Sequence, residues 1–238
     1  MNKPSDIKVF ATYPHPCSYL KDREAVTVFI DPDAPMDRRL YSRLSETGFR
    51  RSGPHVYKPH CKGCNACIPA RVPVARFRPN RTQRKLLRRN HDLRMELLPT
   101  IDDASVYALY ERYICLRHAD GDMYPPSYEQ YTAFLKDAWG ATRYCGFYAG
   151  HDLVAVAVVD VLEQGLSAVY TFYDPDRAER SLGTWVILRQ IDLALALGLD
   201  YLFLGYWIAE SPKMAYKSAF RPLEILGQSG WRIAEDAR

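Results

Sequence analysis

Three cysteines stand two residues apart in one short segment, at positions 61, 64 and 67. Thiols at this spacing are typical ligands of zinc or of an iron–sulfur cluster, and a complete set needs four of them. Cys17 is the early cysteine that could supply the fourth ligand. We therefore expect Cys17, Cys61, Cys64 and Cys67 to converge, either around a metal or cluster or as free structural thiols.

Positive charge is concentrated in residues 71–94. This segment holds nine Arg or Lys and one Asp, a net charge of +8, whereas the whole chain carries +4, so the rest is close to −4. The sequence predicts a helix that begins after an N-cap at Asn80 and continues to His91. Five cations recur on one face of this helix: Arg81, Arg84, Lys85, Arg88 and Arg89.

This face has no interleaved Glu that would neutralise it through i,i+4 pairs. Its like charges favour a polyanion, so the pattern indicates contacts to a nucleic-acid backbone, with a solvated helix face as the alternative. A second cationic face is predicted near the C-terminus, where Lys213, Tyr216 and Lys217 have helical spacing. Phosphate contacts and base stacking there would suit a single-stranded nucleotide end, and an ordinary exposed amphipathic helix is the alternative.

The composition places limits on location and class. The first twenty residues contain no apolar signal-peptide core, and no run of about 18 uncharged apolar residues occurs. We therefore expect a cytoplasmic globular protein. In that reducing compartment, closely spaced cysteines favour metal binding, redox chemistry or packing over disulfides.

The order of predicted elements indicates an α+β fold with two domains. Residues 1–100 are predicted as a small, loop-rich, cysteine-containing domain, and residues 101–238 as an acetyltransferase-like (GNAT-type) domain. The predicted strands are 7–13, 25–30, 67–77, 92–99, 143–149, 152–162, 166–173, 200–207 and 223–228. The predicted helices are 36–48, the basic helix, 102–119, 127–139, 181–198 and 211–220. Cys115 and Cys145 fall inside such elements and are expected in the core.

The loop at residues 180–185 precedes the long predicted helix. Backbone N–H groups at a helix start can hold a phosphate or a developing oxyanion, which makes Gly183 a candidate. An ordinary helix cap at Ser181 explains the same residues. A single glycine departs from the glycine-rich loop expected of an acetyl-coenzyme A binder, so the donor is expected to be different.

Several segments occur in the order found in one enzyme family: YPHPCSYL, GFRRSG, YKPHCKGCNACIPARVPV, NRTQRKLLRRN, MYPP, AVYTFYDP, SLGTW and GYWIAESPKMAYK. On these segments the chain resembles the bacterial aminoacyl-tRNA protein transferases over nearly its whole length. It is most similar to their aspartate/glutamate leucyltransferase branch. The resemblance implies transfer of leucine from leucyl-tRNA to the N-terminal amine of proteins that begin with Asp or Glu, which marks them for degradation.

The resemblance also implies where the chemistry lies. An aminoacyl ester is already activated, so the enzyme has to position the amine and stabilise an oxyanion, and no cofactor is required for this step. The expected catalytic residues are Tyr173, Asp174, Gly183 and Tyr206. An acidic first residue calls for a cation, best an arginine, which makes Arg50, Arg51 and Arg71 candidates for its recognition.

Three alternatives stay open on the sequence. An arginyl donor would need a carboxylate within reach, and Asp160, Asp174 and Glu210 are available. An acyl-coenzyme A N-acetyltransferase of the same fold would need no tRNA. A non-catalytic, zinc-containing RNA-binding module would use the cysteines and the basic helix but would leave residues 170–217 unexplained.

Overall fold

Eight strands form one large mixed sheet in the computed structural model, which describes residues 7–137 and 139–235. In sheet order the strands are β14 (Gly230–Ile233), β13 (Glu224–Gly227), β7 (Ile68–Pro73), β12 (Tyr201–Trp207), β11 (Gly165–Tyr173), β10 (Asp152–Val161), β9 (Thr142–Ala149) and β8 (Leu93–Leu98). Neighbouring strands are antiparallel except β11 and β12, which are parallel. The mixed α and β character predicted from the sequence is confirmed.

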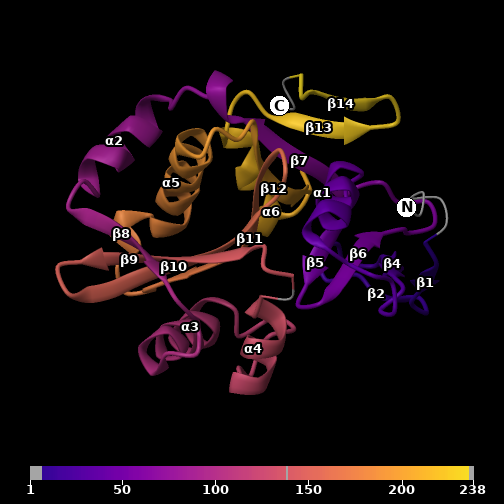
Figure 1. Ribbon diagram of the computed structural model, residues 1–238, viewed down its shortest axis with the longest axis horizontal. Coiled ribbons are helices and arrows are strands. Elements are labelled where there is room, and N and C mark those ends of the chain that lie inside the picture. The colour runs from indigo at the N-terminus through magenta and orange to yellow at the C-terminus, as the bar shows by residue number, and fades with distance from the viewer. Residues whose placement is uncertain (1–6, 138, 236–238) are drawn as a thin grey trace.

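Helices cover both faces of this sheet (Figure 1). The helices α3 (Ala104–Arg117) and α4 (Tyr128–Leu135) pack on one face, and α5 (Leu182–Ala196) packs on the other together with α2 (Arg81–Arg89). Residues 154–159 of β10 are fully buried between the two layers. A strand that is covered on both faces is apolar throughout, which explains the run VAVAVV.

A second sheet of four strands is built from the N-terminal part of the chain. Its order is β1 (Val9–Ala11), β4 (Thr27–Ile30), β6 (His55–Pro59) and β5 (Arg50–Ser52). The helix α1 (Arg38–Glu46) packs beside it. Their shared core includes Leu162, which directly follows β10, and Phe203 of β12. A short pair of strands, β2 (His15–Pro16) and β3 (Glu24–Ala25), precedes β4.

Most predicted elements are confirmed within a few residues. The predicted strand 67–77 forms β7 and then a 3₁₀ turn, η2 (Val74–Arg76). The predicted helix 127–139 ends at Leu135, and Ala138 lies outside the described residues. Among the described residues, no helix combines the length and apolar character needed to cross a bilayer.

Cys145 is buried, as predicted. The prediction for Cys115 is wrong, because this residue is exposed. The buried side of α3 is formed by other positions, among them Tyr110, Tyr113 and Ile114, and Cys115 follows on the solvent side of the helix.

The parallel strands β11 and β12 stay together for only three residues. They pair from Gly165–Ser167 to Tyr201–Phe203, and no further pairs join these two strands among the described residues. β12 has an irregularity between Phe203 and Gly205, where Gly205 adopts a φ of +76° that favours glycine. The two strands therefore diverge toward their C-terminal ends, and we call the space between them, which the Arg50 side chain enters, the opening.

Candidate active site

Arg50 occupies the opening between β11 and β12. Its Nη1 donates to Ser167 Oγ at 2.8 Å, and its Nη2 donates to the backbone oxygen of Ala168. A Cβ atom at Gly205 would lie 3.4 Å from Arg50 Nε, an ordinary van der Waals contact, so the guanidinium packs directly against the backbone of β12 at this glycine. The arginine thus replaces the hydrogen bonding that β12 would otherwise give to β11.

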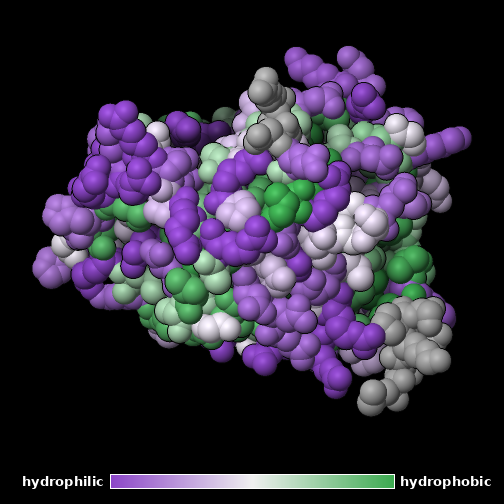
Figure 2. Space-filling view, turned by 90° about the horizontal axis from the view of Figure 1, so that it is seen from above, coloured by the Kyte–Doolittle hydropathy of each residue, from purple (hydrophilic) through white to green (hydrophobic). Residues whose placement is uncertain are grey.

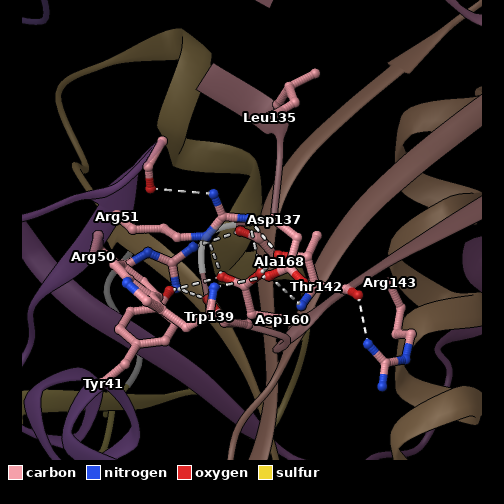
Figure 3. A network of polar contacts seen from close by, with 12 residues as sticks. Tyr41, Arg50, Arg51, Leu135, Asp137, Trp139, Thr142, Arg143, Asp160 and Ala168 are labelled. Carbon is pink, nitrogen blue, oxygen red and sulfur yellow. Dashed lines mark hydrogen bonds and ion pairs between the residues drawn. The ribbon is translucent and has the colours of Figure 1, made fainter. Parts of the chain in front are cut away.

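Arg51 holds the strand that presents Arg50. Successive residues of a strand point to opposite faces, and the Arg51 guanidinium enters the protein interior, where it meets Asp160 (Figure 3). The Nε–Oδ2 and Nη2–Oδ1 distances are 2.6 and 2.8 Å. Tyr41 and Thr142 donate further hydrogen bonds to the same carboxylate at 2.9 and 2.8 Å. The Arg51 and Asp160 side chains are 1% and 0% exposed.

Arg71 is also bound within the protein. Its guanidinium contacts Glu46 and Glu224, each at 2.8 Å, and therefore joins α1 to β13. The same group lies 3.5 Å from the ring centre of Tyr201 and 4.3 Å from that of Trp231. Of the three arginines proposed for acceptor recognition, only Arg50 lies in the opening, while Arg51 and Arg71 already bind carboxylates of the chain.

Lys217 lies beside the opening and is only 5% exposed. Its Nζ donates to the backbone oxygen of Tyr206 and contacts Met214 Sδ at 3.3 Å. Burial, and then the nearby charge of Arg50, lowers the pKa of Lys217 to about 7. Among the described residues, neither Lys217 nor Arg50 forms an ion pair with a carboxylate. Two basic side chains that form no ion pair in the described part of the chain therefore lie near each other, and the proximity of Arg50 disfavours the charged form of Lys217.

The predicted common face of Lys213, Tyr216 and Lys217 is wrong. The segment forms a short helix α6 (Pro212–Ala215) followed by a 3₁₀ turn η4 (Tyr216–Ala219). Because a 3₁₀ turn has three residues per turn, the α-helical i,i+4 spacing no longer holds, and Lys217 turns inward. Lys213 and Tyr216 remain exposed, and Lys213 pairs with Asp120 at 2.8 Å.

The lowered pKa of Lys217 gives a stability prediction. The unfolded lysine keeps its proton up to about pH 10.5, whereas the folded one loses it near pH 7. Unfolding therefore takes up a proton between these values, and the free energy of unfolding should rise with pH by up to about 1.4 kcal/mol per pH unit. Urea unfolding of the wild type and Lys217→Met at several pH values above 7 measures this slope. Parallel pH curves for the two proteins would contradict it.

The predicted catalytic residues occupy two neighbouring places. Tyr173 ends β11, and a Cβ atom at Gly183 would lie 3.0 Å from its ring, so the small residue at the start of α5 accommodates the tyrosine. The Asp174 carboxylate accepts from Arg177 Nε at 3.0 Å. Tyr206 lies on β12, where its hydroxyl donates to the backbone oxygen of Gly48 at 2.9 Å.

The five cations of the predicted basic face are all exposed on α2. We call Arg81, Arg84, Lys85, Arg88 and Arg89 the basic ridge. In Figure 2 hydrophilic side chains dominate the end of the molecule where α2 lies. Asn80 and Gln83 form the capping box that starts this helix, while Leu86 faces the core. The helix lies directly beside α5 (Figure 1).

The four predicted ligand cysteines lie in one neighbourhood. Burial, followed by the nearby thiols of Cys61, Cys17 and Cys64, raises the pKa of Cys67 to about 11. Cys67 lies near enough to Lys217 that a negative charge on the thiol raises the pKa of the lysine, so this group of thiols adjoins the opening. Within the described ranges, no group of three or more His, Cys, Asp or Glu side chains has an arrangement that could hold a metal ion.

Sequence reasoning did not find the contacts that assemble this region. Ser167 and Gly205, which contact Arg50, belong to β11 and β12, and the glycine inside the apolar run LFLGYW is the local signal that could have indicated their divergence. An open hollow of about 720 Å³ lies elsewhere, between α4 and the turn after β5. None of the predicted site residues lines it.

Comparison with known proteins places the chain in a family. Residues 15–85 match the family described as "Arginine-tRNA-protein transferase, N terminus", and residues 105–227 match "Arginine-tRNA-protein transferase, C terminus". An aspartate/glutamate leucyltransferase of Saccharophagus degradans is 51% identical over 228 residues, covering 95% of this chain and 97% of that protein. One of Teredinibacter turnerae is 54% identical over 232 residues, covering 97% and 96%.

A solved domain named for a lysylphosphatidylglycerol synthetase of Agrobacterium fabrum aligns with a TM-score of 0.49 at 14% identity, over 80% of this chain and 65% of that one. That likeness is too distant to support an inference about this chain. The family matches and the identity over nearly the full length are sufficient by themselves. The chain belongs to the arginine-tRNA-protein transferase family.

Proposed function

We propose that this enzyme transfers leucine from leucyl-tRNA to the N-terminal amine of proteins that begin with Asp or Glu. The relatives at about half identity carry the name aspartate/glutamate leucyltransferase. The observation that carries the proposal in the structure is the pair of basic side chains, Arg50 and Lys217, which lie near each other at the opening and form no ion pair among the described residues. An acidic residue of the acceptor would supply the anion that this pair lacks.

The reaction is the aminolysis of an ester. The acceptor amine forms a bond to the leucyl carbonyl carbon, the bond to the ribose oxygen breaks, and the amine's proton ends on the released ribose hydroxyl. We propose that the first N–H groups of α5, at and around Gly183, stabilise the oxyanion, since no side chain caps this helix start. Tyr173, Asp174 and Tyr206 are proposed to shape and position the site around it.

For acceptor recognition we propose Arg50 as the residue that contacts the acidic side chain. Arg51 and Arg71 would serve indirectly, because they fix β5 and β7 through their own ion pairs. Of the three carboxylates considered for an arginyl donor, Asp160 is occupied by Arg51 and Asp174 by Arg177, which leaves the exposed Glu210 for that alternative. An apolar donor such as leucine needs no such carboxylate.

For tRNA we propose that the basic ridge contacts the phosphate backbone, with Lys213 and Tyr216 nearer the acceptor end. Lys217 is too deeply buried for the outer surface, so we propose that it acts within the opening. The dependence on charged tRNA also supports a cytoplasmic location, and the acidic acceptors support a role in N-degron degradation.

We further propose the acetyltransferase-like topology for residues 101–238, with residues 1–100 as a distinct N-terminal part. The antiparallel order β9–β10–β11, followed by α5 and a parallel β12 that diverges from β11, supports this. The separate family matches at 15–85 and 105–227 are consistent with the division. The two parts share the large sheet, because β7 and β8 precede residue 100.

In the described structure these side chains do not form a complete ligand group, so we propose that Cys17, Cys61, Cys64 and Cys67 draw together only when a structural zinc ion or iron–sulfur cluster binds. A set of four neighbouring thiols suits these soft-ligand groups, which would stabilise the N-terminal part and supply no step of the transfer. Elemental analysis of anaerobically purified protein should find zinc or iron near one site per chain. Values near zero for both would remove this proposal.

A transfer assay tests the function and separates the alternatives. Leucyl-tRNA or arginyl-tRNA is supplied with peptides that begin with Asp, Glu or Ala, and product is measured by mass. We expect leucylated Asp and Glu peptides and no product with Ala. Product from arginyl-tRNA alone would favour the arginyl donor, acetylation by acetyl-coenzyme A the acetyltransferase, and tRNA binding without transfer the RNA-binding module.

The ridge gives its own prediction. The double change Arg84→Glu and Arg88→Glu should weaken tRNA binding by tenfold or more and reduce the slope of log K against log salt by about 2, because fewer counterions are released. Affinity measured over a salt series tests this, with Arg189→Glu on the outer side of α5 as the control. Unchanged affinity and slope would exclude the ridge as the phosphate-binding surface.

A further inference from the structure

Buried side-chain amides fix both ends of α2. One binds the turn that carries Lys217, and the other binds the turn that precedes α5. At its start, Gln83 donates from Nε2 to the backbone oxygen of Ala219 at 3.0 Å. Ala219 ends the 3₁₀ turn that carries Lys217. At its end, Asn90 donates from Nδ2 to the backbone oxygen of Arg180 at 2.9 Å. Both amide side chains belong to residues that are at most 3% exposed.

The contact at the end of α2 is reinforced by charge. The Arg180 guanidinium binds Asp92 through two bonds of 3.0 Å each, a forked geometry that fixes orientation as well as distance. Arg180 Nη1 also donates to Asn90 Oδ1 at 3.4 Å, and Arg89 donates to the backbone oxygen of Glu179. The short turn η3 (Ala178–Arg180) is therefore held at both its backbone and its side chain.

The residue that follows Arg180 is strained. Ser181 has φ +48° and ψ +48°, the left-handed conformation that costs energy for a residue with a Cβ atom. Its side chain makes no capping hydrogen bond to α5, so no local interaction of Ser181 offsets the energy of this conformation. Such strain persists only where the surroundings determine the backbone. Here the surroundings are the contacts of Arg180 with Asn90 and Asp92.

We propose that Asn90, Asp92 and Arg180 form a clip that holds Ser181 in this conformation and thereby sets the direction of the first turn of α5. Arg180 is then a positioning residue for transfer. The basic ridge lies on the exposed face of α2, the helix whose C-cap is Asn90. A tRNA bound to the ridge would therefore have a fixed position relative to the turn that contains Gly183. This role rests on the proposed function of that turn.

The test uses the full-length protein with Arg180→Ala. We expect kcat to fall about tenfold, since small displacements of a positioned group cost rate, while the Kd for tRNA stays within about twofold. Amide hydrogen exchange at residues 182–185 should become faster. Arg189→Ala is the matched control, because Arg189 forms an ion pair with Asp192 within α5 and no hydrogen bond or ion pair among the described residues joins it to α2.

The double variant Arg180→Ala, Ser181→Gly provides the decisive comparison. Glycine adopts the left-handed conformation without strain, so this variant should regain most of the lost kcat and the slower exchange. Unchanged kcat and exchange in Arg180→Ala would overturn the proposal, and so would a weaker Kd with normal kcat, which would make Arg180 a phosphate contact. Failure of glycine to restore either quantity would overturn it too. Because exchange is read without substrate, a wild type that transfers no leucine would refute the proposed function and still leave the clip testable.

Discussion

Arg51→Met is expected to lower the free energy of unfolding by about 3–5 kcal/mol, because it leaves the buried Asp160 carboxylate without its cation. Both side chains are almost fully buried, so water cannot replace the lost partner. Tyr41 and Thr142 would still donate to the carboxylate, but neither carries charge. Urea unfolding followed by circular dichroism measures the change.

The matched control is the double variant Arg51→Met, Asp160→Leu. Replacing a whole buried ion pair by apolar side chains is often close to neutral, so most of the loss should be recovered. The surface change Arg189→Met should have an effect below about 1 kcal/mol, as is usual for exposed ion pairs. A single variant that is as stable as the wild type would show that the pair does not hold β5.

Arg50→Gln is expected to reduce kcat/KM for peptides beginning with Asp or Glu by about 10- to 100-fold. A charge-assisted hydrogen bond to a carboxylate contributes about 1.5–3 kcal/mol, and glutamine retains polarity without the charge. The loss should appear mainly in the KM for the peptide, with the Kd for tRNA unchanged. Steady-state transfer at varied peptide concentration measures both parameters.

Two further variants give this result its meaning. Arg50→Lys keeps the charge but loses the forked guanidinium, so its kcat/KM should lie between those of the wild type and Arg50→Gln. Ser167→Ala removes one contact of Arg50 and leaves its guanidinium in place, so selectivity for acidic peptides should persist. If Arg50→Gln keeps the wild-type preference for Asp and Glu over other first residues, acceptor recognition lies elsewhere.

Local signals were sufficient for most of the long elements but not for the partners of the site residues. The Asn80 cap and the spacing of Leu86 define α2 because helix caps and helical periodicity act over a few residues. The pair Arg51–Asp160 joins residues 109 positions apart, and Arg71–Glu224 joins residues 153 positions apart. No local sequence pattern indicates which residues pair over such separations, so Arg51 and Arg71 were predicted to be available for a substrate carboxylate.

Two other outcomes have equally physical causes. The segment from Lys213 to Lys217 has α-helical spacing, but a change to a 3₁₀ turn at Tyr216 directs Lys217 inward. The short strands β5 (RRS) and β6 (HVYKP) were not predicted. The first has no apolar side chain, and the second has only Val56 and Tyr57 between polar residues and a proline, so neither has a strand signature. Their pairing depends on contacts with β4 and the buried ion pair.

The place of β7 in the large sheet governs how the chain can be synthesised and folded. This strand lies between β12 and β13, so a segment made early must wait for partners made more than a hundred residues later. Such long-range pairing is slow and leaves an unpaired edge exposed in the meantime. The nascent N-terminal part therefore emerges from the ribosome with an incomplete sheet, which can close only after β12 and β13 have been synthesised.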